Sequence, residues 1–87
     1  MTKNIPEFIR KLEYLSKYRG CKESEIIFSR FVSRYLHKLS IIEMEDYEIF
    51  LQNTDAEILD WIMYKKEPPL DVKNNSIYNL VLSCLEL

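Results

Sequence analysis

A cation, a thiol and a carboxylate surround a glycine in one pentapeptide, Arg19-Gly20-Cys21-Lys22-Glu23. Gly20 is the only glycine in 87 residues, so the backbone freedom for a sharp reversal is concentrated there. Each residue alone has an ordinary role at a helix end. Gly20 suits a left-handed cap, Arg19 a helix C-terminus and Glu23 a helix N-terminus. These roles do not explain why all three meet at one exposed corner, so the corner is a candidate functional site.

Other chemistry is poorly supported by the residues present. A zinc site needs about four nitrogen or sulfur ligands, and the chain has one histidine, His37, and two cysteines, Cys21 and Cys84. Cys21 lacks a partner cysteine or a base, and nothing marks His37 as more than a solvated residue. A group of carboxylates lacks the apolar pocket that tunes an acid/base pair, and we expect a solvated helix face: Glu43, Glu45, Asp46 and Glu48. We therefore predict no metal site and no catalytic site, and the protein is not expected to be an enzyme.

Length and charge restrict the class of protein. The 87 residues predict one domain over 1–87, with two reduced cysteines and no disulfide framework. Residues 1–38 carry nine Lys/Arg and four carboxylates (+5), whereas residues 39–87 carry three Lys and ten carboxylates (−7). This imbalance can steer a partner to the basic half, but a net charge of −2 disfavours a nucleic-acid module. No apolar run approaches the roughly 20 residues of a membrane span, and no signal peptide is visible, so we expect the bacterial cytosol.

Helix-start signals divide the first half of the chain. Asn4 is a predicted N-cap with Pro6 in the first turn, and apolar residues then recur at helical spacing up to the corner at Gly20. A second helix is predicted over about 23–38, with one broad apolar face.

Two capping boxes begin the next helices, at Ser40 and at Thr54, each with a glutamate three residues later. Pro68-Pro69 stops the fourth helix, and a polar linker is expected over 71–76. The apolar pattern from Ile77 predicts a C-terminal helix.

No segment alternates with the period of a strand, and no Asn-Gly or Asp-Gly hairpin turn occurs. The predicted fold is therefore all-α, a compact bundle of five short helices stabilised by shared burial. We expect Trp61 to be a core anchor and the six tyrosines to frame the core.

The stretch from Arg19 to Met63 resembles the small FAD assembly factors of succinate dehydrogenase, found in bacteria and mitochondria. The R-G-x-x-E motif of that family is matched by Arg19, Gly20 and Glu23. Downstream the family has a leucine and then D-x-x-(L/I)-x-x-W-(L/I), matched here by Leu51, Asp55, Ile58, Trp61 and Ile62. The family often has Met, Leu and Asp where this chain has Cys21, Ser24 and Glu25.

The resemblance implies a protein that binds the flavoprotein subunit of succinate dehydrogenase, or of fumarate reductase in some bacteria. It would promote covalent attachment of FAD to that subunit, and the FAD would belong to the partner, with no cofactor bound tightly here. It also implies that Gly20 and Glu23 contact the partner near its flavin. There Arg19 would donate, and Glu23 accept, charge-assisted hydrogen bonds. We further expect a monomer without direct membrane insertion. The implied partner-binding residues are Arg19, Gly20, Cys21, Lys22, Glu23 and Glu25.

One alternative class remains open on the sequence alone. A generic helical protein-interaction regulator, such as an antitoxin-like partner of an unrelated protein, would have the same composition and helix pattern. The corner at Arg19, Gly20 and Glu23 discriminates between the two, because a generic regulator has no need of it.

Overall fold

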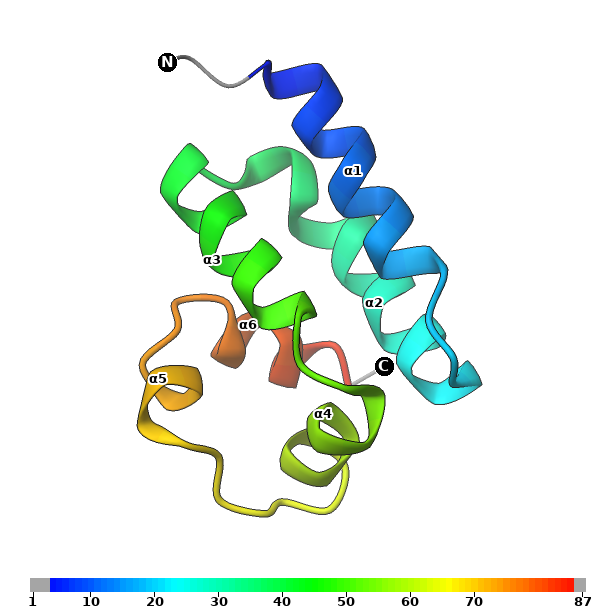
Figure 1. Cartoon of the computed structure of the whole chain (residues 1–87), viewed down its shortest axis with the longest axis vertical. Coiled ribbons are helices and arrows are strands. Elements are labelled where there is room, and N and C mark those ends of the chain that lie inside the picture. The colour runs from blue at the N-terminus through cyan, green and yellow to red at the C-terminus, as the bar shows by residue number, and fades with distance from the viewer. Residues whose placement is uncertain (1–3, 86–87) are drawn as a thin grey trace.

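The computed structural model describes residues 4–85, which form six α-helices and one 3-10 turn and contain no strand (Figure 1). The elements are α1 (Ile5–Lys17), α2 (Lys22–Tyr35), η1 (Leu36–Lys38), α3 (Ile41–Leu51), α4 (Asp55–Ile62), α5 (Leu70–Lys73) and α6 (Tyr78–Ser83). The all-α prediction is confirmed. The predicted number of five helices is wrong, because a further helix, α5, begins at Leu70 and extends into the expected polar linker.

Helix α5 forms because a proline precedes its first residue and one of its side chains is buried in the core. Pro69 is its N-cap residue, with φ of −59°, and Val72 is only 6% exposed in the core. The predicted second helix is also divided. Its α-helical part ends at Tyr35, and the last turn tightens into η1, as often happens at a helix C-terminus.

The three predicted helix starts with a side-chain cap are confirmed. The Asn4 side chain accepts a hydrogen bond from the Glu7 N–H at 3.2 Å. At Ser40 and at Thr54 both halves of the capping box are present, so each glutamate bonds back to the N-cap backbone. These starts depend on atoms three residues apart, which is why the sequence indicates them directly.

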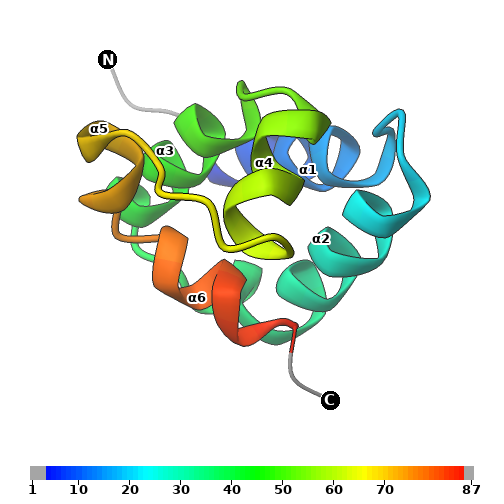
Figure 2. The same ribbon diagram turned by 90° about the horizontal axis from the view of Figure 1, so that it is seen from below.

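Helix α2 is the central element of the fold. It packs against α1, α4 and α6, and α1 also packs against α3. Figure 1 shows α1 and α3 in the upper part of the molecule, α4 and α5 in the lower part, and α2 reaching down to α4. In Figure 2, seen from below, α4, α5 and α6 lie toward the viewer. Within residues 4–85, no helix combines the length and the apolar character needed to cross a bilayer.

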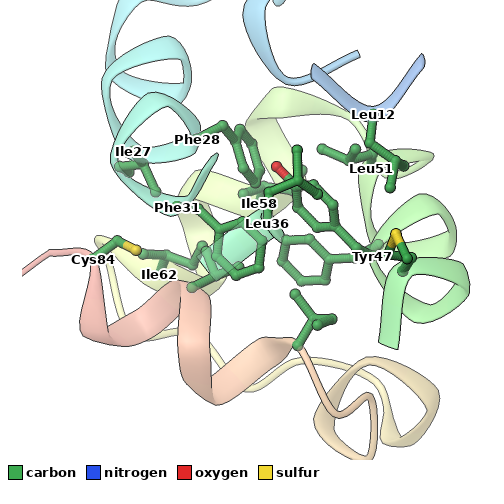
Figure 3. Close-up of a cluster of buried hydrophobic side chains, with 14 of the residues drawn as sticks. Leu12, Ile27, Phe28, Phe31, Leu36, Tyr47, Leu51, Ile58, Ile62 and Cys84 are labelled. Carbon is green, nitrogen blue, oxygen red and sulfur yellow. The ribbon is translucent and has the colours of Figure 1, made fainter. Parts of the chain in front are cut away.

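Aromatic rings fill the centre of the core (Figure 3). Tyr47 stacks on Phe31 with ring centroids 4.4 Å apart, and Phe28 meets Phe50 edge-on at 6.2 Å. Trp61 is 8% exposed, so its predicted role as a core anchor is confirmed.

The prediction that all six tyrosines frame the core is wrong for three of them. The rings of Tyr14, Tyr18 and Tyr64 are 62–68% exposed. Tyr14 and Tyr18 form a tilted ring pair, with centroids 4.6 Å apart, on the outer face of α1 and its C-cap. A tyrosine suits both core and surface, so residue type alone does not assign it to either.

A buried hydroxyl pair joins α1 to α3. The Ser16 hydroxyl donates to the Leu12 carbonyl at 2.6 Å, so in its hydrogen bond with Tyr47 the phenol is the donor. Both side chains are buried, Ser16 at 2% and Tyr47 at 0% exposure. Loss of the acceptor therefore leaves the phenol O–H without a partner in the core.

We expect Ser16→Ala to lower the free energy of unfolding by about 1–3 kcal/mol, because the buried phenol of Tyr47 loses its acceptor. Tyr47→Phe should cost less, because Ser16 keeps its bond to Leu12. The double variant should be more stable than the sum of the two single effects predicts. Urea unfolding of the four proteins measures this cycle, and strictly additive losses would contradict the pairing.

Burial of Tyr47 raises its pKa well above its ordinary value of about 10. Above about pH 10 the phenol therefore stays protonated in the native state but ionises in the unfolded chain. The free energy of unfolding consequently falls as the pH rises above about 10. We expect Tyr47→Phe to remove up to about 1.4 kcal/mol per pH unit of this alkaline loss, measured by urea unfolding between about pH 8 and pH 11. The exposed Tyr64→Phe is the matched control and should keep the wild-type slope.

Candidate protein-binding site

The corner between α1 and α2 is formed by residues 18–21. Tyr18 is the C-cap of α1, and its N–H donates to the Tyr14 carbonyl at 3.0 Å. Gly20 is exposed, as predicted, but its φ is not positive, so its predicted role as a left-handed cap is wrong. The helix has already ended at Lys17, and the chain runs on to an extended Cys21.

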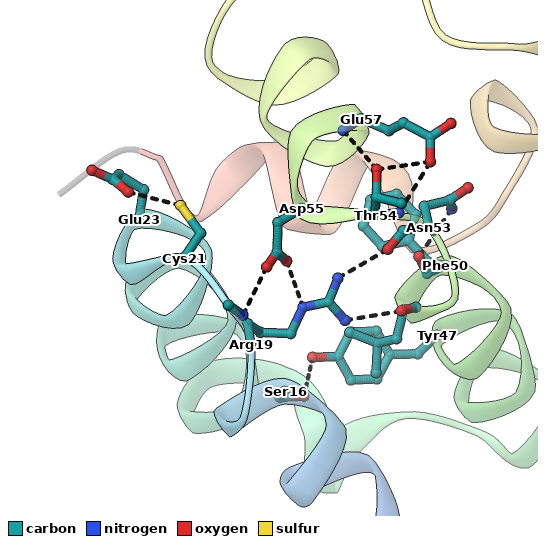
Figure 4. Close-up of polar contacts among 12 residues, drawn as sticks. Ser16, Arg19, Cys21, Glu23, Tyr47, Phe50, Asn53, Thr54, Asp55 and Glu57 are labelled. Atoms are coloured by element: carbon teal, nitrogen blue, oxygen red, sulfur yellow. Dashed lines mark hydrogen bonds and ion pairs between the residues drawn. The ribbon is translucent and has the colours of Figure 1, made fainter.

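The Arg19 side chain points into the protein and is only 9% exposed (Figure 4). Its Nε donates to Asp55 Oδ1 at 2.7 Å, and its two Nη atoms donate to the carbonyls of Leu51 and Asn53 at 2.9 and 3.0 Å. The guanidinium carbon also lies 5.2 Å from the ring centroid of Phe28, in cation–π geometry. Arg19 therefore joins the corner to the connection between α3 and α4.

The α3–α4 connection is chemically suited to this cation. Leu51 is the last residue of α3, whose final carbonyls lack partners within the helix and carry partial negative charge. Asp55 is the first residue of α4, where a carboxylate is favoured by the helix dipole. Its second oxygen accepts the Gly20 N–H at 2.9 Å, so one carboxylate holds both the Arg19 side chain and the Gly20 backbone.

This geometry changes the role expected of Arg19. The sequence predicted that its guanidinium serves the C-terminus of its own helix and donates to a partner. In the structure it complements the end of α3 instead, and three of its five N–H groups donate within the chain.

Sequence reasoning used Asp55 only as a match to the family pattern and did not pair it with Arg19. The sequence did contain a signal for this pair, because the motifs hold one cation, Arg19, and one carboxylate, Asp55, each beside a predicted helix end.

Cys21 and Glu23 form the outer side of the corner. The Cys21 thiol donates to Glu23 Oε2 at 2.8 Å, and this bond lowers the pKa of the exposed Glu23 carboxyl below its ordinary value. Figure 4 shows Glu23 projecting from α2 away from the guanidinium of Arg19. The corner therefore presents an ionised carboxylate, already oriented, beside an exposed glycine.

The two remaining predicted residues lie on the first turns of α2. Lys22 is its first residue and is exposed, and Glu25 is half-buried, with its backbone N–H bonded to the Cys21 carbonyl at 3.1 Å. The structure thus brings all six predicted residues to the corner and the start of α2, and gives Arg19 an internal position.

Part of the basic half is used inside the molecule. Arg30 and Arg34 of α2 donate to the carbonyls of Cys84 and Ser83 at 3.0 and 3.4 Å, where they complement the C-terminal end of α6.

The acidic residues of α3 are likewise more than a solvated face, which corrects that prediction. Lys11 and Glu48 form an ion pair at 2.6 Å, and Asp46 accepts a hydrogen bond from the Ser76 hydroxyl at 2.7 Å. Within residues 4–85, no cluster of three or more His, Cys, Asp or Glu side chains is placed to hold a metal ion.

The fold and the corner together define a small all-helical protein that presents a preorganised polar surface. Residues 10–84 match the family model described as flavinator of succinate dehydrogenase, and the chain belongs to this family.

Curated relatives support the same assignment, and each is named succinate dehydrogenase assembly factor 2, mitochondrial. The relative from Dictyostelium discoideum is 37% identical over 65 residues, which cover 75% of this chain and 46% of the relative. The relatives from Komagataella phaffii (40% over 58 residues; 67% and 30%) and Caenorhabditis briggsae (33% over 76 residues; 82% and 60%) are similar. The matched region thus spans between about a third and three fifths of these relatives. Their names refer to mitochondria and give no support to a bacterial source.

We expect Asp55→Ala to lower the free energy of unfolding by about 1–3 kcal/mol, because it leaves a largely buried guanidinium without its anion. Asp60→Ala is the matched control on the same helix. Its carboxylate is 41% exposed and pairs with Lys66 at 3.6 Å, so its loss should cost less than about 0.5 kcal/mol.

The Gly20 amide reports on the same contact. Selective ¹⁵N-glycine labelling gives one backbone signal, because the chain has one glycine. Asp55→Ala should move its amide proton upfield, since a hydrogen bond to a carboxylate deshields the proton, whereas Asp60→Ala should leave it in place. An unmoved Gly20 signal in the Asp55 variant would contradict the contact.

Proposed function

We propose that this protein binds the flavoprotein subunit of succinate dehydrogenase and promotes covalent attachment of FAD to that subunit. Membership of the flavinator family supports this function over a generic helical regulator. Gly20, Cys21 and Glu23 form the proposed contact surface, with Lys22 and Glu25 on the adjoining first turns of α2, and the internal Arg19 holds the corner in place.

The observation that carries the proposal is that the isolated chain does not require glycine at position 20. Its φ is not positive, so the backbone does not exclude a side chain. A Cβ placed there would have Asp55 Oδ2 as its nearest neighbour, at an ordinary contact distance of 3.6 Å. Because neither conformation nor packing calls for glycine, its advantage lies in the close approach of another molecule to the exposed backbone.

Glu23 supplies the charged contact of the proposed interface. Its carboxylate is exposed, ionised at neutral pH and oriented by the Cys21 thiol. A preoriented carboxylate makes a charge-assisted hydrogen bond with less loss of side-chain freedom than a free one. Arg19 contributes indirectly, because it fixes the corner from which Gly20 and Glu23 are presented.

The proposed mechanism is positioning. By binding the flavoprotein as a monomer, the chain would hold the FAD and the acceptor histidine of that subunit in a reactive arrangement. The flavin supplies the bond-forming chemistry, and this chain contributes binding and orientation without a cofactor of its own. In an organism with fumarate reductase, the same surface would serve its flavoprotein subunit.

We expect Gly20→Ala, Gly20→Arg and Glu23→Ala to abolish or strongly reduce flavinylation of the co-expressed flavoprotein subunit while leaving the fold intact. Both residues are exposed, so each change should alter the free energy of unfolding by less than about 0.5–1 kcal/mol. Covalent FAD is read by in-gel flavin fluorescence and stability by thermal unfolding.

Glu7→Ala is the matched control, because Glu7 is an exposed glutamate in the first turn of α1, as Glu23 is in the first turn of α2. It should leave flavinylation at the wild-type level. Full flavinylation by a normally folded Glu23→Ala protein would show that the corner is only a helix junction.

A further inference from the structure

A shallow groove of about 260 Å³ begins at Glu23 and follows α2 away from the corner. Its lining is Glu23, Ile26, Ile27 and Arg30 of α2, with Met63 at the C-cap of α4 and Leu85 after α6. The four α2 residues have the i, i+3, i+4, i+7 spacing of a single helix face. This face of α2 is therefore open between the end of α4 and the end of α6.

The groove exposes large apolar side chains at its rim. Ile26 is 44% and Met63 42% exposed, whereas the lining residue Ile27 is 4% exposed and belongs to the core. Methionine adapts its shape to varied apolar surfaces, which suits a wall that receives another side chain. The groove thus offers an apolar floor with one adaptable side.

The two ends of the groove carry opposite charges, and the positive one is engaged within the chain. The ionised Glu23 carboxylate lies at the corner end, where it accepts a hydrogen bond from the Cys21 thiol. Its charged neighbour Lys22 is not part of the groove lining. Arg30, about 10 Å further along the helix axis, donates to the Cys84 carbonyl and so holds Leu85 against the groove. The available charge is therefore negative and lies next to the candidate interface.

We propose that this groove binds a segment of the flavoprotein subunit that presents one large apolar side chain beside a lysine or arginine. The inference rests on the proposed function and adds the chemistry of the recognised segment. Two observations favour this occupant over a second copy of the chain. Glu23 belongs both to the corner and to the groove, so a molecule docked on the corner continues into it. The negative end of the groove complements a basic residue next to the apolar one.

Charge introduced on the rim tests the groove directly. Ile26→Glu and Met63→Glu should each raise the Kd for the purified flavoprotein subunit, prepared without FAD, by at least about tenfold in calorimetry. Each places a carboxylate against an apolar side chain and beside Glu23. Flavinylation in co-expression should fall in parallel, and thermal unfolding should show that both variants fold.

Ile41→Glu is the matched control, since Ile41 is 47% exposed at the start of α3, which Figure 1 shows at the far end of the molecule from the corner. It should bind with the wild-type Kd. Wild-type affinity in both rim variants would contradict the proposed role of the groove without contradicting the proposed function. A wild-type chain that neither binds the subunit nor supports flavinylation would overturn both.

The identity of the bound segment is tested by photo-crosslinking. Benzoylphenylalanine in place of Met63 should crosslink to a flavoprotein peptide with a large apolar residue within one or two positions of a lysine or arginine. The same label in place of Ile41 should give no such product. Crosslinking from position 63 only to a second copy of this chain, or to a flavoprotein peptide without a basic residue, would overturn the assigned occupant.

Discussion

The ion pair between Arg19 and Asp55 is the contact on which the rest of the corner depends. Alone, a largely buried charge is costly, and it is tolerated here because the guanidinium also finds two backbone carbonyls and an aromatic face. The same carboxylate holds the Gly20 amide. One residue of α4 thus sets the backbone position of a corner that lies 36 positions earlier in the chain.

This arrangement divides the R-G-x-x-E motif into an inner and an outer part. Arg19 faces the protein, where its contacts contribute stability, and Gly20 and Glu23 face outward, where they contribute little to it. Cys21 connects the two parts, because it is the N-cap residue of α2 and its thiol orients Glu23. A motif read as one functional unit therefore contains residues with different physical tasks, and their substitutions act on different properties.

Helix α2 performs several tasks at once, as expected in a chain with few elements. Its apolar face forms the centre of the core, its first turn carries the exposed carboxylate, and a third face lines the groove toward Met63 and Leu85. Small domains bury a limited fraction of their surface, so one helix commonly serves both core and partner. The contacts of α2 with α1, α4 and α6 make it a rigid base for the corner.

Local interactions were readable from the sequence by itself. The helix starts at Asn4, Ser40 and Thr54 depend on side chains three residues from the groups they cap, and the apolar spacing determined the all-α class. Contacts between distant segments were decided only by the tertiary structure. They include the inward direction of Arg19, the burial of Val72 that makes α5 a helix, and the exposure of half of the tyrosines. Spacing along the chain specifies which groups can interact within a helix, but a cation finds its carboxylate 36 residues away only once the helices have packed.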